Sequence, residues 1–465
     1  MNYRILFKLL VIFALVLALT IPNLMIRDLV SERSYFRQEA KQSIAASWTG
    51  EQKFLGPILV VPYTERREKK IWDDKKHHYR VVEQVNDRRL FVLPAELKID
   101  ADIRTEERRR GIYTIPVYAS TIDVRGTFEN ASVRDLIKNE AVTVAWDKVY
   151  LSAPVSDIRG IAVQPLLHWN GEEYEFVSGS GIGPQGNGMR AGIAGLSGSQ
   201  AASYPFSFSV QLHGMETLAF SPVGKNTQVT VRSPWRHPSF LGRYLPNERT
   251  VGDDGFSAVW RVASFSSDMG RVSALCETGK CEAFFDNTFG VALIQPVDIY
   301  QQAERSVKYA VLIITLTFVA FFLFEVLRAV PLHPVQYLLL GCSLTVFYLL
   351  LLSLSEHIAF GPAYLIASLA NTALIGVYVT AVLHSRSRGI VLSAALLLLY
   401  GMLFLILRSE DNALLMGSLL IFAVLALVML MTRNLDWYRV SERVARQRDR
   451  NGQTPDPEAG PLAVD

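Results

Sequence analysis

The chain has 465 residues, a formal net charge of +3 and a hydrophobic content of 50%. So mild a charge gives no support to nucleic-acid binding, and no basic patch is interleaved with aromatic residues as in RNA-binding modules. Instead, six apolar stretches have roughly the 20 residues needed to cross the hydrocarbon of a bilayer. The composition therefore indicates an integral membrane protein.

The first apolar segment, Leu9–Ile26, follows the basic residues Arg4 and Lys8. A positive flank before an apolar core also describes a cleavable signal peptide. This run, however, is long, continues past Pro22, and is not followed by a small-residue cleavage site. We expect residues 1–30 to form an uncleaved signal-anchor helix, with cleavage as the alternative.

Residues 31–308 form the largest hydrophilic stretch, and they predict a β-rich domain after a short stalk helix at 31–50. Apolar and polar residues alternate strictly over Phe206–Leu212, which is the pattern of a half-buried strand, and Ile58–Tyr63 is a continuous buried-strand run. The other candidate strands are Lys98–Arg104, Ile112–Tyr118, Thr121–Phe128, Val142–Tyr150, Gln228–Arg232, Ala258–Ala263 and Gly290–Pro296. Many short strands between Gly, Pro and Asn favour a sandwich or barrel-like fold.

Several segments of this domain are expected to be loops. The charged runs Glu65–Arg80 and Glu106–Arg110 predict solvated loops, and Val223–Asn226 predicts a hairpin connection. Gly181–Gly186 matches GxGxxG, but its Gly- and Ser-rich surroundings cannot begin the helix that a dinucleotide site requires. The adjacent pair His77–His78 is not expected to bind metal, because neighbouring strand residues point to opposite faces.

Two of the three cysteines, Cys276 and Cys281, stand close together in the sequence CETGKC, with Gly279 available for a tight turn. In an oxidising compartment this spacing allows a small disulfide loop. Free thiols and a metal site are the alternatives, although no further ligands are spaced to complete a metal site. Cys342 lies within an apolar segment.

The remaining five apolar segments run over residues 309–329, 336–354, 358–383, 389–407 and 412–432 and are followed by a basic tail, 433–465, with a disordered end. Lys and Arg collect on one side, at Arg386, Arg388 and Arg433, whereas the opposite loops are mixed or acidic. The positive-inside rule then places both termini in the cytoplasm and residues 31–308 in the periplasm.

The candidate functional residues lie at the membrane, where ionisable groups are costly. Glu325 is followed three residues later by Arg328 on the same helical face, and Glu356–His357 lie at the outer end of the third segment. The latter pair is close in depth to Arg408, Glu410 and Asp411, and together these residues could bind a polar headgroup or relay protons. For all of them a structural role is the alternative. Asn371 and Thr372 are expected to hydrogen-bond to a neighbouring helix. No GxSxG or HExxH motif is present, so no catalytic set, cofactor or metal is predicted.

Several stretches, in order along nearly the whole chain, resemble the CreD inner-membrane proteins of Gram-negative bacteria. They are GPILVVPY (56–63), GIYTIPVY (111–118), SDIRGI (156–161), HPSFLG (237–242), PVDIYQQAERSVKYAVLIITLTFVAFFLFE (296–325), HPVQYLLLG (333–341), FYLLLLSLSEH (347–357) and RNLDWY (433–438). The resemblance implies a stress-response protein of the inner membrane under two-component regulation, associated with cell envelope integrity and with tolerance to β-lactams or colicins. It supplies no catalytic residues and no cofactor.

Three functions remain open on the sequence. The favoured one is a non-enzymatic envelope protein whose periplasmic β-domain binds envelope proteins or cell-wall components while its helices contact the lipid bilayer. The second is a transporter or flippase-like protein that uses Glu325, Glu356 and His357, although no inverted repeat is visible. The third is a membrane enzyme acting on lipid-linked envelope material.

Overall fold

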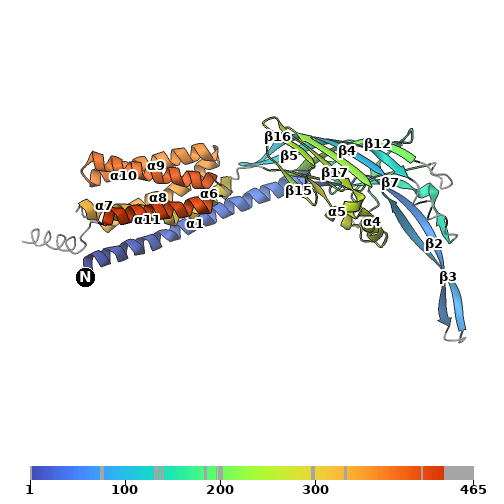
Figure 1. The fold of residues 1–465 in the computed structure, drawn as a ribbon, viewed down its shortest axis with the longest axis horizontal. Coiled ribbons are helices and arrows are strands. Elements are labelled where there is room, and N and C mark those ends of the chain that lie inside the picture. The colour runs from blue at the N-terminus through green and yellow to red at the C-terminus, as the bar shows by residue number, and fades with distance from the viewer. Residues whose placement is uncertain are drawn as a thin grey trace, which may run out of the picture. The chain divides into compact units, whose positions relative to one another are not determined.

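The computed structural model describes residues 3–73, 78–129, 133, 135, 138, 141–182, 186–194, 196, 203–294, 299–328, 332–409 and 412–433. His77, part of the Gly-rich stretch and most of the basic tail lie outside the described residues. The chain divides into a helical unit of residues 1–36 with 297–465, and a β-rich unit of residues 37–296 (Figure 1). The expected β-rich domain between the first helix and the later ones is therefore present.

The first helix, α1, runs without interruption over Tyr3–Ser47 and so contributes to both units. The sequence had suggested a membrane segment and a separate stalk helix. The two are one helix because residues 27–47 contain neither Gly nor Pro and consist mostly of good helix formers. Helix α1 ends just before Thr49–Gly50.

The other helices of the helical unit are α6 Ile299–Lys308, α7 Ala310–Arg328, α8 Pro334–Ser355, α9 Phe360–Val382, α10 Arg386–Arg408 and α11 Ala413–Thr432. Among the described residues, five helices are long and apolar enough to cross a membrane, namely α1 and α8 to α11. A sixth span results if α6 and α7, bent by 42° at their junction, count as one. The HPVQ stretch begins α8 with a capping box, in which His333 and Gln336 satisfy each other's backbone N–H groups and Pro334 occupies the first turn.

The β-rich unit contains three sheets. Its strands are β1 Gln52–Phe54, β2 Ile58–Asp73, β3 His78–Val92, β4 Glu96–Arg110, β5 Tyr113–Glu129, β6 Val142–Val144, β7 Tyr150–Pro154, β8 Leu166–Trp169, β9 Glu172–Glu175, β10 Val177–Ser178, β11 Gly188–Gly192, β12 Ser203–Met215, β13 Thr217–Phe220, β14 Asn226–Ser233, β15 Pro238–Gly242, β16 Glu248–Gly252, β17 Gly255–Ala263 and β18 Phe289–Leu293. The eight-stranded sheet has the order β16-β17-β14-β4-β5-β12-β8-β9, and the four-stranded sheet β1-β13-β18-β15. In the six-stranded sheet, β10-β11-β7-β2-β3 are consecutive and β6 pairs with β2. Short helices α3 Ser264–Ser267, α4 Met269–Glu277 and α5 Ala283–Asp286 precede β18.

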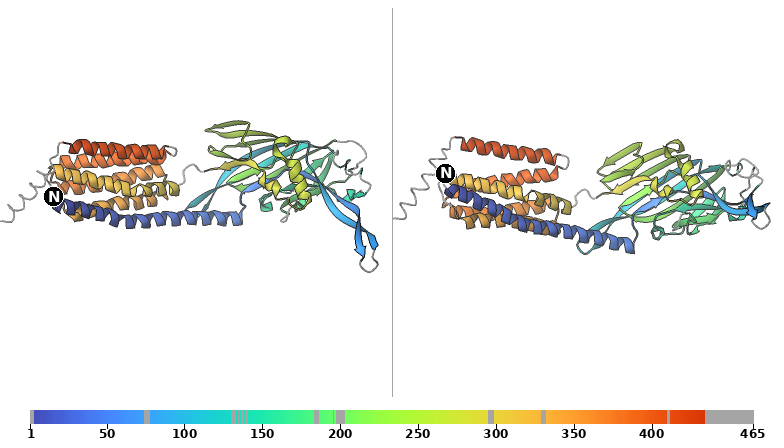
Figure 2. Two further views of the ribbon diagram at one scale, coloured as in Figure 1. Left: turned by 60° about the horizontal axis from the view of Figure 1, so that its bottom comes forward. Right: turned by 90° about the horizontal axis from the view of Figure 1, so that it is seen from below.

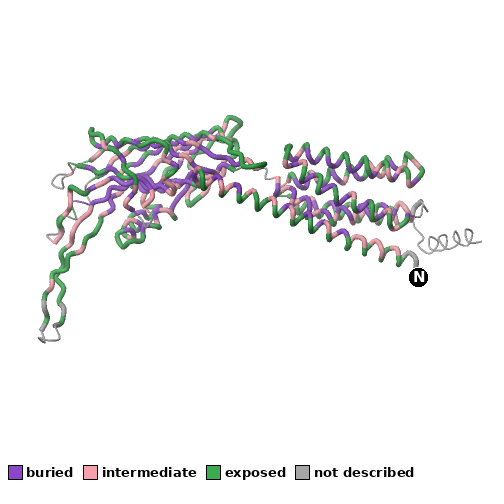
Figure 3. The backbone as a smooth tube through the Cα atoms, turned by 180° about the vertical axis from the view of Figure 1, so that it is seen from behind, coloured by how far each residue is buried: buried purple, intermediate pink, exposed green. Residues whose placement is uncertain are grey.

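One apolar core joins the three sheets (Figure 3). The predicted alternation on β12 is confirmed, because Phe206, Phe208, Val210 and Leu212 are buried while the residues between them are exposed. Trp260 on β17 is fully buried and packs against Phe289 of the four-stranded sheet. Such interdigitated aromatic side chains hold the sheets together.

Three loop predictions were wrong. Glu65–Arg80 lies largely in β2 and β3, which pair from Leu59 opposite Val92 to Asp73 opposite His78, and Glu106–Arg110 is the end of β4. Both faces of these strand segments are exposed, so their sequences show no alternation of apolar and polar residues. Hydrogen bonds to the partner strand hold the segments in place instead. Val223–Asn226 is not a hairpin connection, because β13 and β14 belong to different sheets.

Candidate functional site

Glu325 lies at the centre of a polar cluster formed by three helices. Lys8 of α1 forms an ion pair with Glu325 of α7 and donates a 2.8 Å hydrogen bond to the carbonyl oxygen of Leu332. The Tyr337 hydroxyl, on α8, donates to Glu325 Oε2 at 2.9 Å. The side chain of Arg328 lies outside the described residues. Lys8 and Tyr337 had not been predicted as partners, since nothing in the sequence connects positions so far apart.

A second cluster surrounds Glu356 at the C-terminal end of α8. Arg33 Nε of α1 is 3.6 Å from Glu356 Oε1, and the Tyr300 hydroxyl of α6 donates to the same oxygen at 3.5 Å. His357 is exposed, and its Nδ1 is 3.1 Å from the carbonyl oxygen of Ser353 in its own helix. Glu410 and Asp411, which were expected nearby, lie outside the described residues.

The two clusters hold α1 against the other helices at two depths. Positions 8 and 33 are about 37 Å apart along a helix that rises 1.5 Å per residue, close to the thickness of a bilayer with its interfacial layers. Each carboxylate has a cationic partner and a tyrosine partner. This arrangement suits an attachment of α1 better than a proton relay, which needs a carboxyl free to exchange its proton.

Between these depths, Asn371 of α9 links three helices. Its Nδ2 donates to the Tyr400 hydroxyl of α10 at 2.7 Å, and Ser343 of α8 donates to its Oδ1. Interhelical bonds of this kind fasten helices within a membrane. The buried hydroxyl of Thr372 has no hydrogen-bond partner among the described residues, in contrast to the expectation for that side chain.

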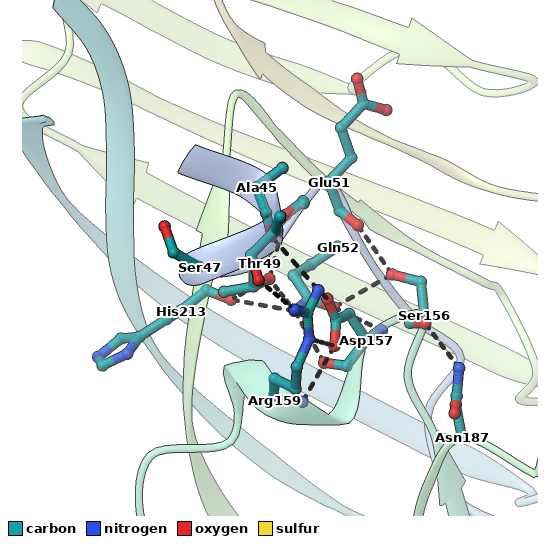
Figure 4. A network of polar contacts seen from close by, with 12 residues as sticks. Ala45, Ser47, Thr49, Glu51, Gln52, Ser156, Asp157, Arg159, Asn187 and His213 are labelled. Carbon is teal, nitrogen blue, oxygen red and sulfur yellow. Dashed lines mark hydrogen bonds and ion pairs between the residues drawn. The ribbon is translucent and has the colours of Figure 1, made fainter. Parts of the chain in front are cut away.

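The C-terminal end of α1 is fastened to the β-rich unit by Gln52, whose side chain is fully buried (Figure 4). Its Nε2 donates to Thr49 Oγ1 at 2.8 Å and to the carbonyl oxygens of Asp157 and His213, both at 3.0 Å. Its Oε1 accepts from Ser156 Oγ at 3.1 Å and from the backbone N–H of Asp157 at 3.2 Å. One amide therefore satisfies polar groups from three separate segments.

Residues 156–161, the SDIRGI stretch, also attach the C-terminal end of α1 to the β-rich unit. Arg159 donates to the carbonyl oxygens of Ala46 at 2.7 Å and Ala45 at 3.3 Å, where a cation is favoured by the helix dipole. Its hydrogen bonds also lower the pKa of the Asp157 carboxyl, against the opposing effect of burial. A Cβ at Gly160 would lie 2.4 Å from Gln52 Nε2, so the backbone approach here requires glycine.

Cys276 and Cys281 are joined in a buried disulfide, and Gly279 makes the turn between them with a φ of +95°. The loop begins at the end of α4, next to the base of β3. Burial raises the pKa of the neighbouring Glu277, and the charge of Arg88 on β3 partly offsets that rise. Within the described residues, no group of three or more His, Cys, Asp or Glu side chains is placed to hold a metal ion.

A two-stranded arm extends from the β-rich unit. It consists of residues 66–73 of β2 and 78–85 of β3, and Figures 1 and 2 show it reaching beyond the rest of its domain. Strand β2 pairs with β7 and β6 only up to Glu65, and β3 is the last strand of its sheet, so both edges of the arm lack a described neighbouring strand.

One face of the arm carries an apolar row, Trp72, Tyr79, Val81 and Val85. Trp72 lies opposite Tyr79, Lys70 opposite Val81 and Arg66 opposite Val85, which places all six side chains on the same face. The apolar members are 47%, 64%, 50% and 58% exposed, and the rings of Trp72 and Tyr79 meet edge to face at 5.0 Å. No other part of the described β-rich unit combines unpaired strand edges of this length with such a row.

Comparison with known proteins gives one consistent relationship. The family model described as "Inner membrane protein CreD" matches residues 4–438. The chain is 37% identical over 434 residues to the inner membrane protein CreD of Escherichia coli (strain K12), covering 92% of this chain and 93% of the relative. Among solved structures, an M1 zinc metallopeptidase from Deinococcus radiodurans and a mutant form of it align with 37% of the chain, at 8% and 9% identity and TM-scores of 0.19 and 0.20, covering 38% of each of those chains. Scores this low support no inference about fold or activity.

Proposed function

The chain belongs to the CreD family of inner membrane proteins, and from that premise we propose that it is a non-enzymatic envelope protein whose β-rich domain binds an extended segment of another envelope protein. The observation that carries the proposal is the arm, with its unpaired strand edges and its exposed apolar row. Through this contact the protein supports envelope integrity and tolerance to β-lactams or colicins.

The proposal places the β-rich domain in the periplasm and both termini in the cytoplasm. It is supported by the basic residues Lys8, Arg386, Arg388 and Arg433, which collect at one set of helix ends. A periplasm-active reporter fused after Arg388 should be inactive, whereas the same reporter fused after Asp411 should be active. The reverse pattern would overturn this orientation.

The arm suits a protein strand as its ligand. A two-stranded ribbon is only marginally stable in water, and a third strand along β3 would satisfy its free backbone groups while covering apolar side chains. The neighbouring charges of Arg66, Lys70 and Glu83 would then select the register of the added strand. The paired state of Glu325 and Glu356 gives transport or membrane catalysis less support.

Site-specific photocrosslinking in cells tests the proposal. A photoreactive residue at Val81 of the full chain should form an adduct with one envelope protein, and the same residue at Val251, an equally exposed valine on edge strand β16, should not. The double variant Val81→Lys/Val85→Lys should abolish this adduct and reduce β-lactam tolerance to that of cells lacking the protein. The shape-matched Val81→Thr/Val85→Thr variant should retain both. Adducts with cell-wall fragments alone, or unchanged tolerance in the lysine variant, would contradict the proposal.

A further inference from the structure

Arg89, Tyr150 and Arg190 lie on one face of the six-stranded sheet. Tyr150 is on β7, which pairs with β2 on one side and with β11 on the other. Beyond β2, Arg89 of β3 is opposite Pro62, which is two residues along β2 from the partner of Tyr150. On the other side, Arg190 of β11 is two residues from Gly192, which is opposite Tyr150. Because residues that are opposite each other or two apart share a face, Tyr150 has an arginine on either side.

Contacts between these side chains bring both guanidinium groups to the tyrosine. Arg89 Nη1 donates a 2.9 Å hydrogen bond to the carbonyl oxygen of Gly181, and the Tyr150 hydroxyl donates to the same oxygen at 3.4 Å. Arg190 Cζ lies 5.9 Å from the centre of the Tyr150 ring, which is a cation–π contact. One arginine therefore meets the hydroxyl end of Tyr150, and the other meets the face of its ring.

Neither arginine has a carboxylate partner among the described residues. Arg88, the residue before Arg89 on β3, points to the opposite face and is 3.1 Å from the carboxylate of Glu65. Arg89 and Arg190 are exposed and form no ion pair with a described residue. Burial raises the pKa of the Tyr150 hydroxyl, the charges of both arginines oppose that rise, and no described carboxylate contributes to it. The two positive charges therefore repel each other, and a bound anion would remove that repulsion.

The surface between the two arginines has room for a small ligand. Strands β3 and β11 are three strand spacings apart, roughly 14 Å, and both arginine side chains reach inward to Tyr150. Gly192 lies opposite Tyr150 without a side chain, and a Cβ built at this position would have no described atom within 4 Å. The space beside the tyrosine ring is therefore open within the described part of the domain.

We propose that Arg89 and Arg190 together bind a doubly charged phosphate group, beside Tyr150. A phosphate dianion offers at least three oxygens to two guanidinium groups, each of which can donate two parallel hydrogen bonds, and its charge balances both arginines. A carboxylate has two oxygens and a single charge, so it would balance only one of them. The phosphate is either free or carried as a monoester by an envelope molecule. The site lies inward of the arm on β3, so it stands whether or not the arm binds a protein strand.

Isothermal titration calorimetry of the full chain in a non-ionic detergent tests the proposal, with inorganic phosphate, glucose 1-phosphate and acetate as ligands at constant ionic strength. Acetate should bind at least about tenfold more weakly than the better of the two phosphates. Lowering the pH from about 7.5 to about 5 should weaken phosphate binding, because the ligand takes up a proton with a pKa of about 6 while the arginines stay charged. Tighter binding of glucose 1-phosphate than of inorganic phosphate would assign the site to a phosphorylated envelope molecule, and the reverse order would assign it to free phosphate.

Charge variants identify the residues responsible. Arg89→Gln/Arg190→Gln should lower the affinity for phosphate by a factor on the order of one hundred, at roughly tenfold for each guanidinium removed. The matched variant Arg109→Gln/Arg110→Gln removes two exposed arginines from the end of β4 and should leave the affinity unchanged. Arg190 forms no hydrogen bond with a described residue, so Arg190→Gln alone should weaken binding without loss of the fold.

A melting curve gives an independent measurement. Phosphate should raise the melting temperature of the native chain and of the β4 variant, but not that of Arg89→Gln/Arg190→Gln, because a ligand stabilises only a protein that binds it. Absence of phosphate binding, acetate binding as tight as that of phosphate, or an equal loss of affinity in the two double variants would overturn the proposal.

Discussion

Replacing Gln52 by leucine tests how strongly the end of α1 is fastened to the β-rich domain. Leucine has nearly the same volume but offers no hydrogen bonds to the carbonyl oxygens of Asp157 and His213 or to the Asp157 N–H, which Gln52 now satisfies. The Asp157 carbonyl oxygen keeps its bond from the Gly160 N–H, so the His213 carbonyl oxygen and the Asp157 N–H are the two groups that lose their main partner. At about 1–3 kcal/mol each, they predict a loss of roughly 2–6 kcal/mol in the free energy of unfolding.

Urea unfolding of the full chain in detergent, followed by tryptophan fluorescence, measures this loss. Every tryptophan except Trp437 lies in residues 37–296, so the signal reports on the β-rich domain. Gln164→Leu is the matched control, because Gln164 is exposed and makes a single 2.8 Å bond to the carbonyl oxygen of Phe176. It should cost about 0.5 kcal/mol or less. A loss for Gln52→Leu no larger than that of the control would refute the reasoning.

Three further outcomes are expected. Lys8→Met leaves the Glu325 carboxylate without its cation and should lower the melting temperature in detergent. The double variant Lys8→Met/Glu325→Met should recover most of the loss. A double variant no more stable than the single one would show that the ion pair is not the cause. Because Asp157 has a lowered pKa in the folded state, its contribution is present above the unfolded pKa of about 3.9 and is lost as pH falls through the folded value. Asp157→Asn should therefore be less stable than the native chain at neutral pH, and the difference should vanish in acid; a constant difference would contradict the linkage. Replacing both Cys276 and Cys281 by serine should lower the free energy of unfolding by about 2 kcal/mol, as for a short closed loop, and reductant should bring the native chain to the same value without affecting the variant.

The sequence was most informative where side chains alternate between core and solvent. Phe206 to Leu212 could be assigned to a strand because one face of β12 is buried along its length. The outer part of β2 has both faces exposed, so its charged residues resemble a loop, and only pairing with β3 reveals the strand. The local alternation of apolar and polar residues shows which face of a strand is buried, but it does not show which strand pairs with it.

The candidate clusters show the same limit at longer range. Glu325 and Glu356 could be selected because a carboxylate is unusual beside an apolar helix. Their partners Lys8 and Arg33 are on α1, which the entire β-rich domain separates from them in the sequence. From the sequence, Lys8 is interpreted only as the positive flank of a signal-anchor. Distance in sequence, rather than residue type, concealed these contacts.

Because α1 is one continuous helix, the number of residues between two positions sets the angle between their side chains around the helix axis. At about 100° per residue, positions 8 and 33 differ by only about 20° around the helix axis, which is why both can meet carboxylates of the same group of helices. Inserting a single residue between them would rotate Lys8 by about 100° and turn it away from Glu325 if Arg33 kept its place. A flexible linker tolerates changes in length, but this helix does not: even a whole heptad, which nearly restores the angle, would shift Lys8 by about 10 Å along the axis and away from the depth of Glu325.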